Sequence, residues 1–220
     1  HERNGSYILA LFDNSVPAFN FIRFFFEWLI EDSKLYLLVK PKDEVNLTIL
    51  QKEHNELIQK AKATGRLCIL GQNATPADAA LFSDFSIAIG SYSTLVISAL
   101  QGARVIYLDH EQMNQGPQGK YCTLHNLGPN RCVFYDLESI KSALLQYFDD
   151  PQSNPNLGDA SSVLDEFDPF RDGKAGERIG EYVSWYLEGL SKGLNREGAL
   201  QYSTRKYANK WGFDKVIRGL

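Results

Sequence analysis

The sequence predicts an α/β fold, namely a doubly wound, mainly parallel sheet of about six strands with C-terminal helices. Two observations lead to this prediction. Short apolar runs typical of buried strands alternate with segments of helical periodicity along most of the 220-residue chain. In addition, residues 84–109 (DFSIAIGSYSTLVISALQGARVIYLD) contain two such runs around a short apolar helix. This is the pattern of a parallel βαβ unit whose strands are buried on both faces.

The remaining elements follow from local signals. The predicted strands are residues 6–12, 35–41, 66–70, 85–89, 103–109 and 132–136. The predicted helices are residues 19–30, 46–65, 74–83, 93–101, 137–148, 174–190 and 196–210. Thr75, Pro76 and Asp78 form a strong helix start, and Gly65 is a typical helix end. The strand that contains Ile87 and Ala88 is apolar at both alternating positions, so we expect it at the centre of the sheet.

Two parts are expected: a sheet domain over residues 1–173 and a helical extension over residues 174–220 packed on it. We expect residues 110–131 to form a functional or mobile loop, and residues 151–165 to form a surface connection. The Phe-rich helix at 19–30 is apolar nearly all round. One of its faces should therefore pack on the C-terminal helices or on a partner. The chain begins with His1 rather than Met, and we expect it to be part of a longer protein.

Composition narrows the class of protein. The net charge of −4 argues against broad nucleic-acid binding. Three cysteines without a CxxC pair favour a reducing cytoplasm over a disulfide framework. No signal peptide is recognisable, and the Phe-rich run is too short to span a bilayer. Neither a zinc pattern nor an Asp-x-Asp motif occurs, so we expect no metal ligands.

The turn between the strand at 85–89 and the following helix is the main candidate site. Small and hydroxyl residues meet free backbone N–H groups here, at the N-terminus of a helix whose dipole favours an anion. An ordinary helix cap explains the same hydroxyl residues. The candidate binding residues are Gly90, Ser91, Tyr92, Ser93 and Thr94.

Four further residues are candidates for binding a phosphorylated ligand. Lys40 follows a strand and is able to contact phosphate, and Asp109 is able to accept a ribose or sugar hydroxyl or to cap the next loop. Lys174 and Arg178 lie one helical turn apart and are able to reach a diphosphate, although salt bridges within the helix are the stronger explanation for them. His110 and His125 are expected to be solvated loop residues.

Residues 84–109 resemble the donor-binding half of GT-B glycosyltransferases of bacterial surface and capsular polysaccharide biosynthesis. CDP-glycerol glycerophosphotransferases and GT-B sialyl- or Kdo-transferases are more distant. The shared theme is a strand ending in a small residue, a Ser-Thr pair, an apolar helix and a strand ending in Asp, here Gly90, Ser93, Thr94 and Asp109. A second patch, residues 168–183 (DPFRDGKAGERIGEYV), resembles the closing motif of the surface-polysaccharide group.

The resemblance implies a Rossmann-like domain that binds a nucleotide-activated sugar or alcohol, with its phosphate at Ser93 and Thr94 and no cofactor or protein-bound metal. It also implies that the catalytic base lies on a missing N-terminal Rossmann-like domain, and that the full protein associates peripherally with a membrane. Relatives carry His-Pro where this chain has Lys40-Pro41. Lysine supplies a positive charge there but not a neutral acid or base near pH 7.

Two alternatives to a transferase half remain. One is a sugar-nucleotide epimerase of GT-B shape, which needs carboxylates and a histidine converging near the donor. The other is a non-catalytic α/β binding or regulatory module, because fold alone does not determine function.

Overall fold

The computed structural model describes residues 5–13, 18–42, 44–71, 73–90, 92–113, 116–117 and 119–216. The chain divides into two compact units, His1–Leu164 and Asp165–Leu220. Residues 165–173 therefore group with the C-terminal helices.

The first unit contains a six-stranded sheet in which every neighbouring pair of strands is parallel. Its strands are β1 (Tyr7–Asp13), β2 (Leu35–Pro41), β3 (Leu67–Ile69), β4 (Phe85–Ile89), β5 (Arg104–Leu108) and β6 (Val133–Phe134). They lie in the order β3-β2-β1-β4-β5-β6. From β1 the next two strands are added on one side, and β4, β5 and β6 are added on the other. The order in which strands are added therefore reverses between β1 and β4, as in the doubly wound fold that the sequence predicts.

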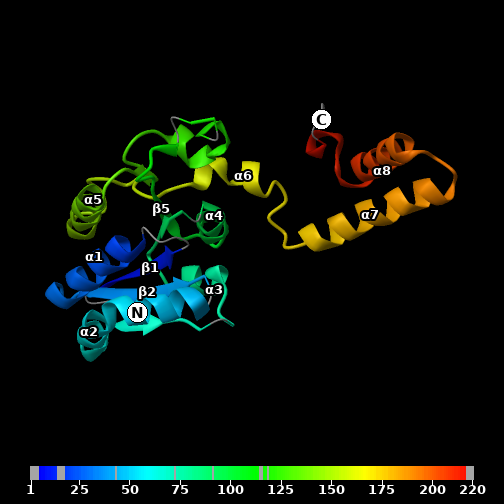
Figure 1. The fold of residues 1–220 in the computed structure, drawn as a ribbon. Helices are drawn as coiled ribbons and strands as arrows, with labels where there is room; N and C mark the ends of the chain where they lie inside the picture. Colours follow the sequence, from blue (N-terminus) through cyan, green and yellow to red (C-terminus); the bar gives the residue numbers. More distant parts are fainter. Residues whose placement is uncertain are drawn as a thin grey trace. The chain divides into compact units, whose positions relative to one another are not determined.

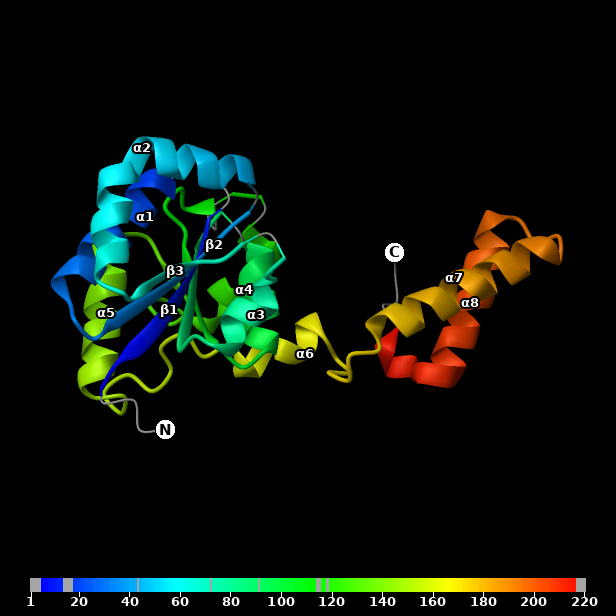
Figure 2. The ribbon, with the colours of Figure 1, turned by 90° about the horizontal axis from the view of Figure 1, so that it is seen from below.

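Helices cover both faces of this sheet. They are α1 (Ala18–Glu31), α2 (Glu44–Ala63), α3 (Pro76–Leu81), α4 (Tyr92–Leu100) and α5 (Leu137–Asp149). Helices α1, α2 and α5 lie on one face, and α3 and α4 lie on the other (Figures 1 and 2). The start predicted for α3 is confirmed, because the side chains of Thr75 and Asp78 form a reciprocal capping box.

The core is centred on β1 and β4. All five residues of β4 are buried, which confirms its predicted central place. Phe85 and Ile87 of β4 pack with Leu9 and Leu11 of β1 in one continuous hydrophobic cluster. Since both faces of the sheet are covered, apolar side chains occupy both alternating positions along the central strands.

The Phe-rich helix α1 is covered within the first unit. Phe21, Phe25 and Phe26 are each at most 1% exposed. Lys141 of α5 lies over the rings of Phe24 and Trp28, with Nζ 5.7 and 5.4 Å from their centroids. The expectation that the C-terminal helices or a partner cover one face is therefore wrong. Helix α5 lies beside α1 on the same face of the sheet and contacts it.

The expectation of a surface connection at residues 151–165 is confirmed only in part, because residues 151–156 are mostly exposed and the segment then enters the core. Leu157 is fully buried in the core. The next residue, Gly158, donates its backbone N–H to the carbonyl of Arg131 (2.7 Å) and accepts from the backbone N–H of Val105 (2.8 Å). This segment lacks periodicity because single residues, not a regular face, enter the core. It ends in the short helices η4 (Ser161–Val163) and α6 (Leu164–Phe167).

The second unit contains the two predicted C-terminal helices, α7 (Ala175–Ser191) and α8 (Arg196–Trp211), followed by a short turn, η5 (Phe213–Lys215). The helices contact each other along their length. Gly189 of α7 lies against Ala199 of α8, where a Cβ on the glycine would come within 3.0 Å of the Ala199 backbone. The hydroxyls of Tyr182 and Thr204 are 3.0 Å apart across the same contact.

Candidate functional site

The turn from β4 into α4 lies at the carboxyl-end edge of the sheet, next to the reversal between β1 and β4. Gly90 has φ 65°, a left-handed conformation that glycine adopts without strain. Ser91 lies outside the described residues. Ser93 is exposed and Thr94 is half-buried, both in the first turn of α4. The first N–H groups of a helix have no partner within the helix, so this turn is suited to an anion.

Tyr92 faces away from this turn toward the loop after β5. Its hydroxyl accepts a hydrogen bond from the backbone N–H of Leu124 (2.9 Å). Its ring meets the ring of Tyr107 edge to face, with centroids 5.8 Å apart. Burial raises the pKa of Tyr92 well above its ordinary value, so the phenol stays neutral. Tyr92 thus joins the start of α4 to the loop.

Asp109 holds the same loop from the end of β5. Its side chain is only 1% exposed. One carboxylate oxygen accepts from the backbone N–H of Met113 (2.8 Å). The other lies 3.0 Å from Nε2 of His125, whose side chain is 11% exposed. The loop-capping interpretation of Asp109 therefore describes its contacts, and the expectation of a solvated His125 is wrong.

The loop itself contains two 3₁₀ turns, η2 (Gly119–Tyr121) and η3 (Thr123–Leu127). Together with β5 and α4 they enclose a pocket of about 340 Å³. Its lining residues are Tyr92, Tyr107, Met113, Gly119, Tyr121, Cys122 and His125. A second pocket of about 180 Å³ extends from Gly90 to Glu111 and shares Tyr107 and Met113 with the first. We call these two adjoining pockets the β5 recess.

Two groups that line the β5 recess, the Cys122 thiol and the Tyr107 phenol, are neutral donors at pH 7. Burial raises the pKa of the Cys122 thiol to about 11, so it is not a thiolate nucleophile. Burial, with the nearby negative charge of Asp109, raises the pKa of Tyr107 to about 12. The recess combines aromatic surface with a few hydrogen-bonding groups, which is typical of small-molecule sites.

The other predicted site residues lie elsewhere. Lys40 ends β2 at the same edge of the sheet, one strand (β1) away from β4, and its Nζ donates to the carbonyl of Pro41 (2.6 Å). Lys174 and Arg178 belong to the second unit. Lys174 is exposed, whereas Arg178 is buried and pairs with Asp172. The structure thus brings Gly90, Tyr92 and Asp109 together around one recess.

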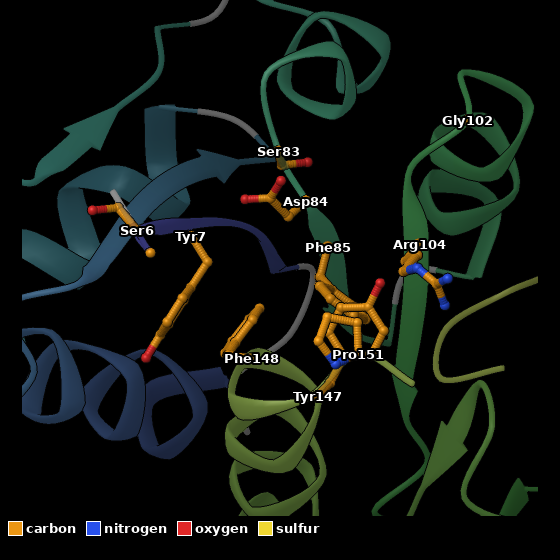
Figure 3. Close-up of a pocket in the computed structure, with 11 residues that line it drawn as sticks. Ser6, Tyr7, Ser83, Asp84, Phe85, Gly102, Arg104, Tyr147, Phe148 and Pro151 are labelled. Atoms are coloured by element: carbon orange, nitrogen blue, oxygen red, sulfur yellow. The ribbon is translucent and has the colours of Figure 1, made fainter. Parts of the chain in front are cut away.

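A third pocket, of about 400 Å³, lies at the opposite edge of the sheet, where β1, β4 and β5 begin (Figure 3). The Tyr7 ring stacks on Phe148 there, with centroids 3.5 Å apart. Asp84 accepts from the backbone N–H of Ile8, and Arg104 donates to the carbonyl of Pro155. These charged groups tie segments of the chain together, so we assign this pocket a structural role.

The fold is that of a Rossmann-like α/β domain, and the β5 recess lies at the carboxyl ends of its strands. Comparison with protein-family models, curated proteins and solved structures finds no match to this chain. Among the described residues, no helix has both the length and the apolar character needed to cross a membrane. The same part of the chain contains no cluster of three or more side chains able to hold a metal ion.

Proposed function

We propose that the first unit binds a nucleotide-activated sugar or alcohol, as the donor half of a transferase of bacterial surface polysaccharide biosynthesis. The observation that carries this proposal is the β5 recess, which lies directly beside the Gly90 turn. Doubly wound sheets bind their ligands at this edge, where the strand order reverses. The resemblance of residues 84–109 to GT-B donor domains supports the same assignment.

Each part of such a ligand has a suitable surface. An aromatic base fits the tyrosine rings of the pocket, since rings favour edge-to-face and offset contacts. Tyr121, which is 73% exposed, also lines the recess and adds aromatic surface for a base. The phosphates fit the first turn of α4 at Ser93 and Thr94, with Lys40 as a nearby cation. Asp109 acts in this arrangement as a positioning residue that holds the wall of the recess.

A departing nucleotide phosphate gains stability from such preorganised donors, which is the chemistry that transfer requires. The acceptor's general base belongs to the N-terminal Rossmann-like domain that the resemblance implies. The first unit alone then binds the donor without turning it over.

A sugar-nucleotide epimerase is the second candidate, because Asp109 and His125 converge at the recess. Nε2 of His125 is engaged by Asp109, and Nδ1 is buried without a hydrogen-bond partner among the described residues. Neither nitrogen is therefore presented to a ligand as an acid or base. This geometry favours the donor-binding function over epimerisation.

Isothermal titration of the full chain with CMP, CDP and UDP tests the proposal. Ser93→Ala combined with Thr94→Val should weaken nucleotide binding about tenfold or more, because hydrogen bonds to a charged group are worth roughly 1–3 kcal/mol. Ser142→Ala, at an exposed serine of α5, is the matched control. Absence of binding, or equal affinity for the parent and the double variant, would contradict the proposal.

A further inference from the structure

The smaller pocket of the β5 recess is the part that the Gly90 turn borders. It has a volume of about 180 Å³ and extends from Gly90 to Glu111. Its apolar lining residues are Ile89, Tyr107, Leu108 and Met113. A cavity of about 150 Å³ is large enough to hold a benzene molecule. The smaller pocket therefore accommodates one compact chemical group rather than a whole nucleotide.

Two carboxylates give the smaller pocket a negative charge. They belong to Asp109 and Glu111, which are both lining residues. Among the described residues that line the two pockets of the recess, none is a lysine or an arginine. The recess therefore repels the phosphates of a nucleotide, which fit the first turn of α4 instead, and it attracts a cation.

The negative charge acts on other groups of the recess. Burial, together with the charges of Asp109 and Glu111, raises the pKa of Tyr107 to about 12. Burial, with a contribution from Asp109, raises the pKa of Cys122 to about 11. A negative charge opposes the formation of a phenolate or a thiolate, and it stabilises a nearby cation for the same reason. Since Cys122 lines the larger pocket, the charge of Asp109 acts across both pockets.

Tyr107 contributes aromatic surface to both pockets. Its ring meets the rings of Tyr92 and His125 nearly at right angles, with an interplanar angle of 88° in each pair. Aromatic rings attract cations through the negative charge of their faces, and the attraction is larger where water is excluded. Tyr107 is only 6% exposed, so it offers a cation a ring that is largely shielded from water.

The hydrogen bonds of Asp109 indicate which kind of cation fits. One of its oxygens accepts from the backbone N–H of Met113, and the other lies 3.0 Å from Nε2 of His125. A primary ammonium group has three N–H donors, and each of them needs an acceptor. A quaternary ammonium group has no donor and packs its methyl groups on apolar and aromatic side chains. The smaller pocket therefore suits a quaternary ammonium better than a primary one.

We propose that the smaller pocket binds a quaternary ammonium group, with the Tyr107 ring as its contact surface and Glu111 as its counter-charge. This proposal rests on the proposed function and names its activated alcohol as a cationic one, such as choline. The base then occupies the larger pocket, and the phosphates lie at the first turn of α4. The alcohol passes Gly90 and places its cationic end between the carboxylates and the ring.

Isothermal titration of the full chain with two pairs of ligands tests this proposal. Each pair consists of the choline ester of CDP or UDP and its neutral isostere, in which a carbon atom replaces the nitrogen. The choline ester should bind about tenfold more tightly than the isostere, because the ring and the carboxylates attract only the charged ligand. Glu111→Gln should reduce this preference to about threefold. Glu56→Gln, at an exposed carboxylate of α2 on the other face of the sheet, is the matched control and should preserve it.

Titration with CDP and UDP alone distinguishes a failure of this proposal from a failure of the proposed function. If neither nucleotide nor any of the esters binds, both are wrong. If a nucleotide binds but its choline ester binds no more tightly than the neutral isostere, only the quaternary ammonium site is wrong. A preference that Glu111→Gln leaves at tenfold would place the cation outside the smaller pocket and would also overturn the proposal.

Discussion

The guanidinium carbon of Arg178 lies 3.5 Å from the centroid of the Phe170 ring. It also lies 4.8 Å from the centroid of the Trp211 ring, and its side chain pairs with the carboxylate of Asp172. With only 5% of its side chain exposed, Arg178 takes the place that an apolar residue has in a larger core. It joins the segment before α7 to the end of α8 through cation–π contacts.

Arg178→Lys should destabilise the second unit by about 1–2 kcal/mol, because an ammonium lacks the planar surface that stacks on two rings. Arg205→Lys, at an exposed position of α8, should leave stability unchanged. Amide hydrogen exchange in α7 and α8 measures the difference. Equal protection in the two variants would show that stacking on Phe170 and Trp211 contributes nothing.

Alanine substitutions at two glycines with left-handed φ distinguish the cost of backbone strain from the cost of steric crowding. Gly158 (φ 69°) lies so close to Arg104 that an added Cβ would come within 2.9 Å of the Arg104 Cβ. Gly102 (φ 88°) has open space around it. Gly102→Ala should cost about 1–2 kcal/mol from the φ angle alone, and Gly158→Ala about 1–3 kcal/mol more from overpacking. Urea denaturation of both variants tests this, and equal losses would contradict it.

Glu188 should make the α7–α8 contact sensitive to acid. Hydrogen bonds from Lys192, Lys206 and Tyr202 lower the pKa of Glu188 from 4.5 to about 2. A carboxylate with a lowered pKa stabilises the folded state above its ordinary pKa, and that stabilisation disappears as the pH falls through the folded pKa.

The protection of amides in α7 and α8, expressed relative to the intrinsic exchange rate at each pH, should therefore be constant above about pH 5.5 and fall between about pH 4.5 and 2. Glu188→Gln should remove most of this dependence, whereas Glu197→Gln at the exposed start of α8 should preserve it. An unchanged acid response in Glu188→Gln would locate the titrating group elsewhere.

Asp109→Ala should destabilise the first unit by about 2–4 kcal/mol, because it leaves a backbone donor and the buried His125 without their acceptor. Glu111→Ala removes an exposed carboxylate from the same recess and should cost less than about 0.5 kcal/mol. Chemical denaturation compares the two. A small effect of Asp109→Ala would mean that the loop is held by Tyr92 and its own turns.

The strands and helices were predictable where periodicity and length agreed. The apolar run Phe85–Ile89 could only be a buried strand, and Thr75 with Asp78 could only begin a helix. Leu157 and His125 were not predictable, because each is a single buried residue in a segment without a repeating pattern. The amphipathic spacing of α7 was predictable from the sequence. The side of α7 that packs on α8 was not, because the spacing does not reveal that α8 contacts the side with Glu181 and Glu188.

The candidate site was predictable only in outline. The Gly90 turn follows from the order of strand, small residue and helix. The β5 recess depends on contacts between Asp109 and His125 and between Tyr92 and Leu124, which are distant in sequence and have no local signal. A buried histidine in a glycine-rich loop is therefore found only once the fold is known.

The strand order determines at which point of synthesis the sheet and core of the first unit can be completed. The backbone N–H of Ile8 in β1 donates to Asp84, 76 residues later in the chain, and β1 gains its second neighbour only when β4 has been made. The amino end of β5 gains its last backbone partner from Gly158. Until synthesis has passed Gly158, the nascent chain therefore exposes the core around Phe85. Chaperones are expected to bind this exposed surface until Leu157 enters the core.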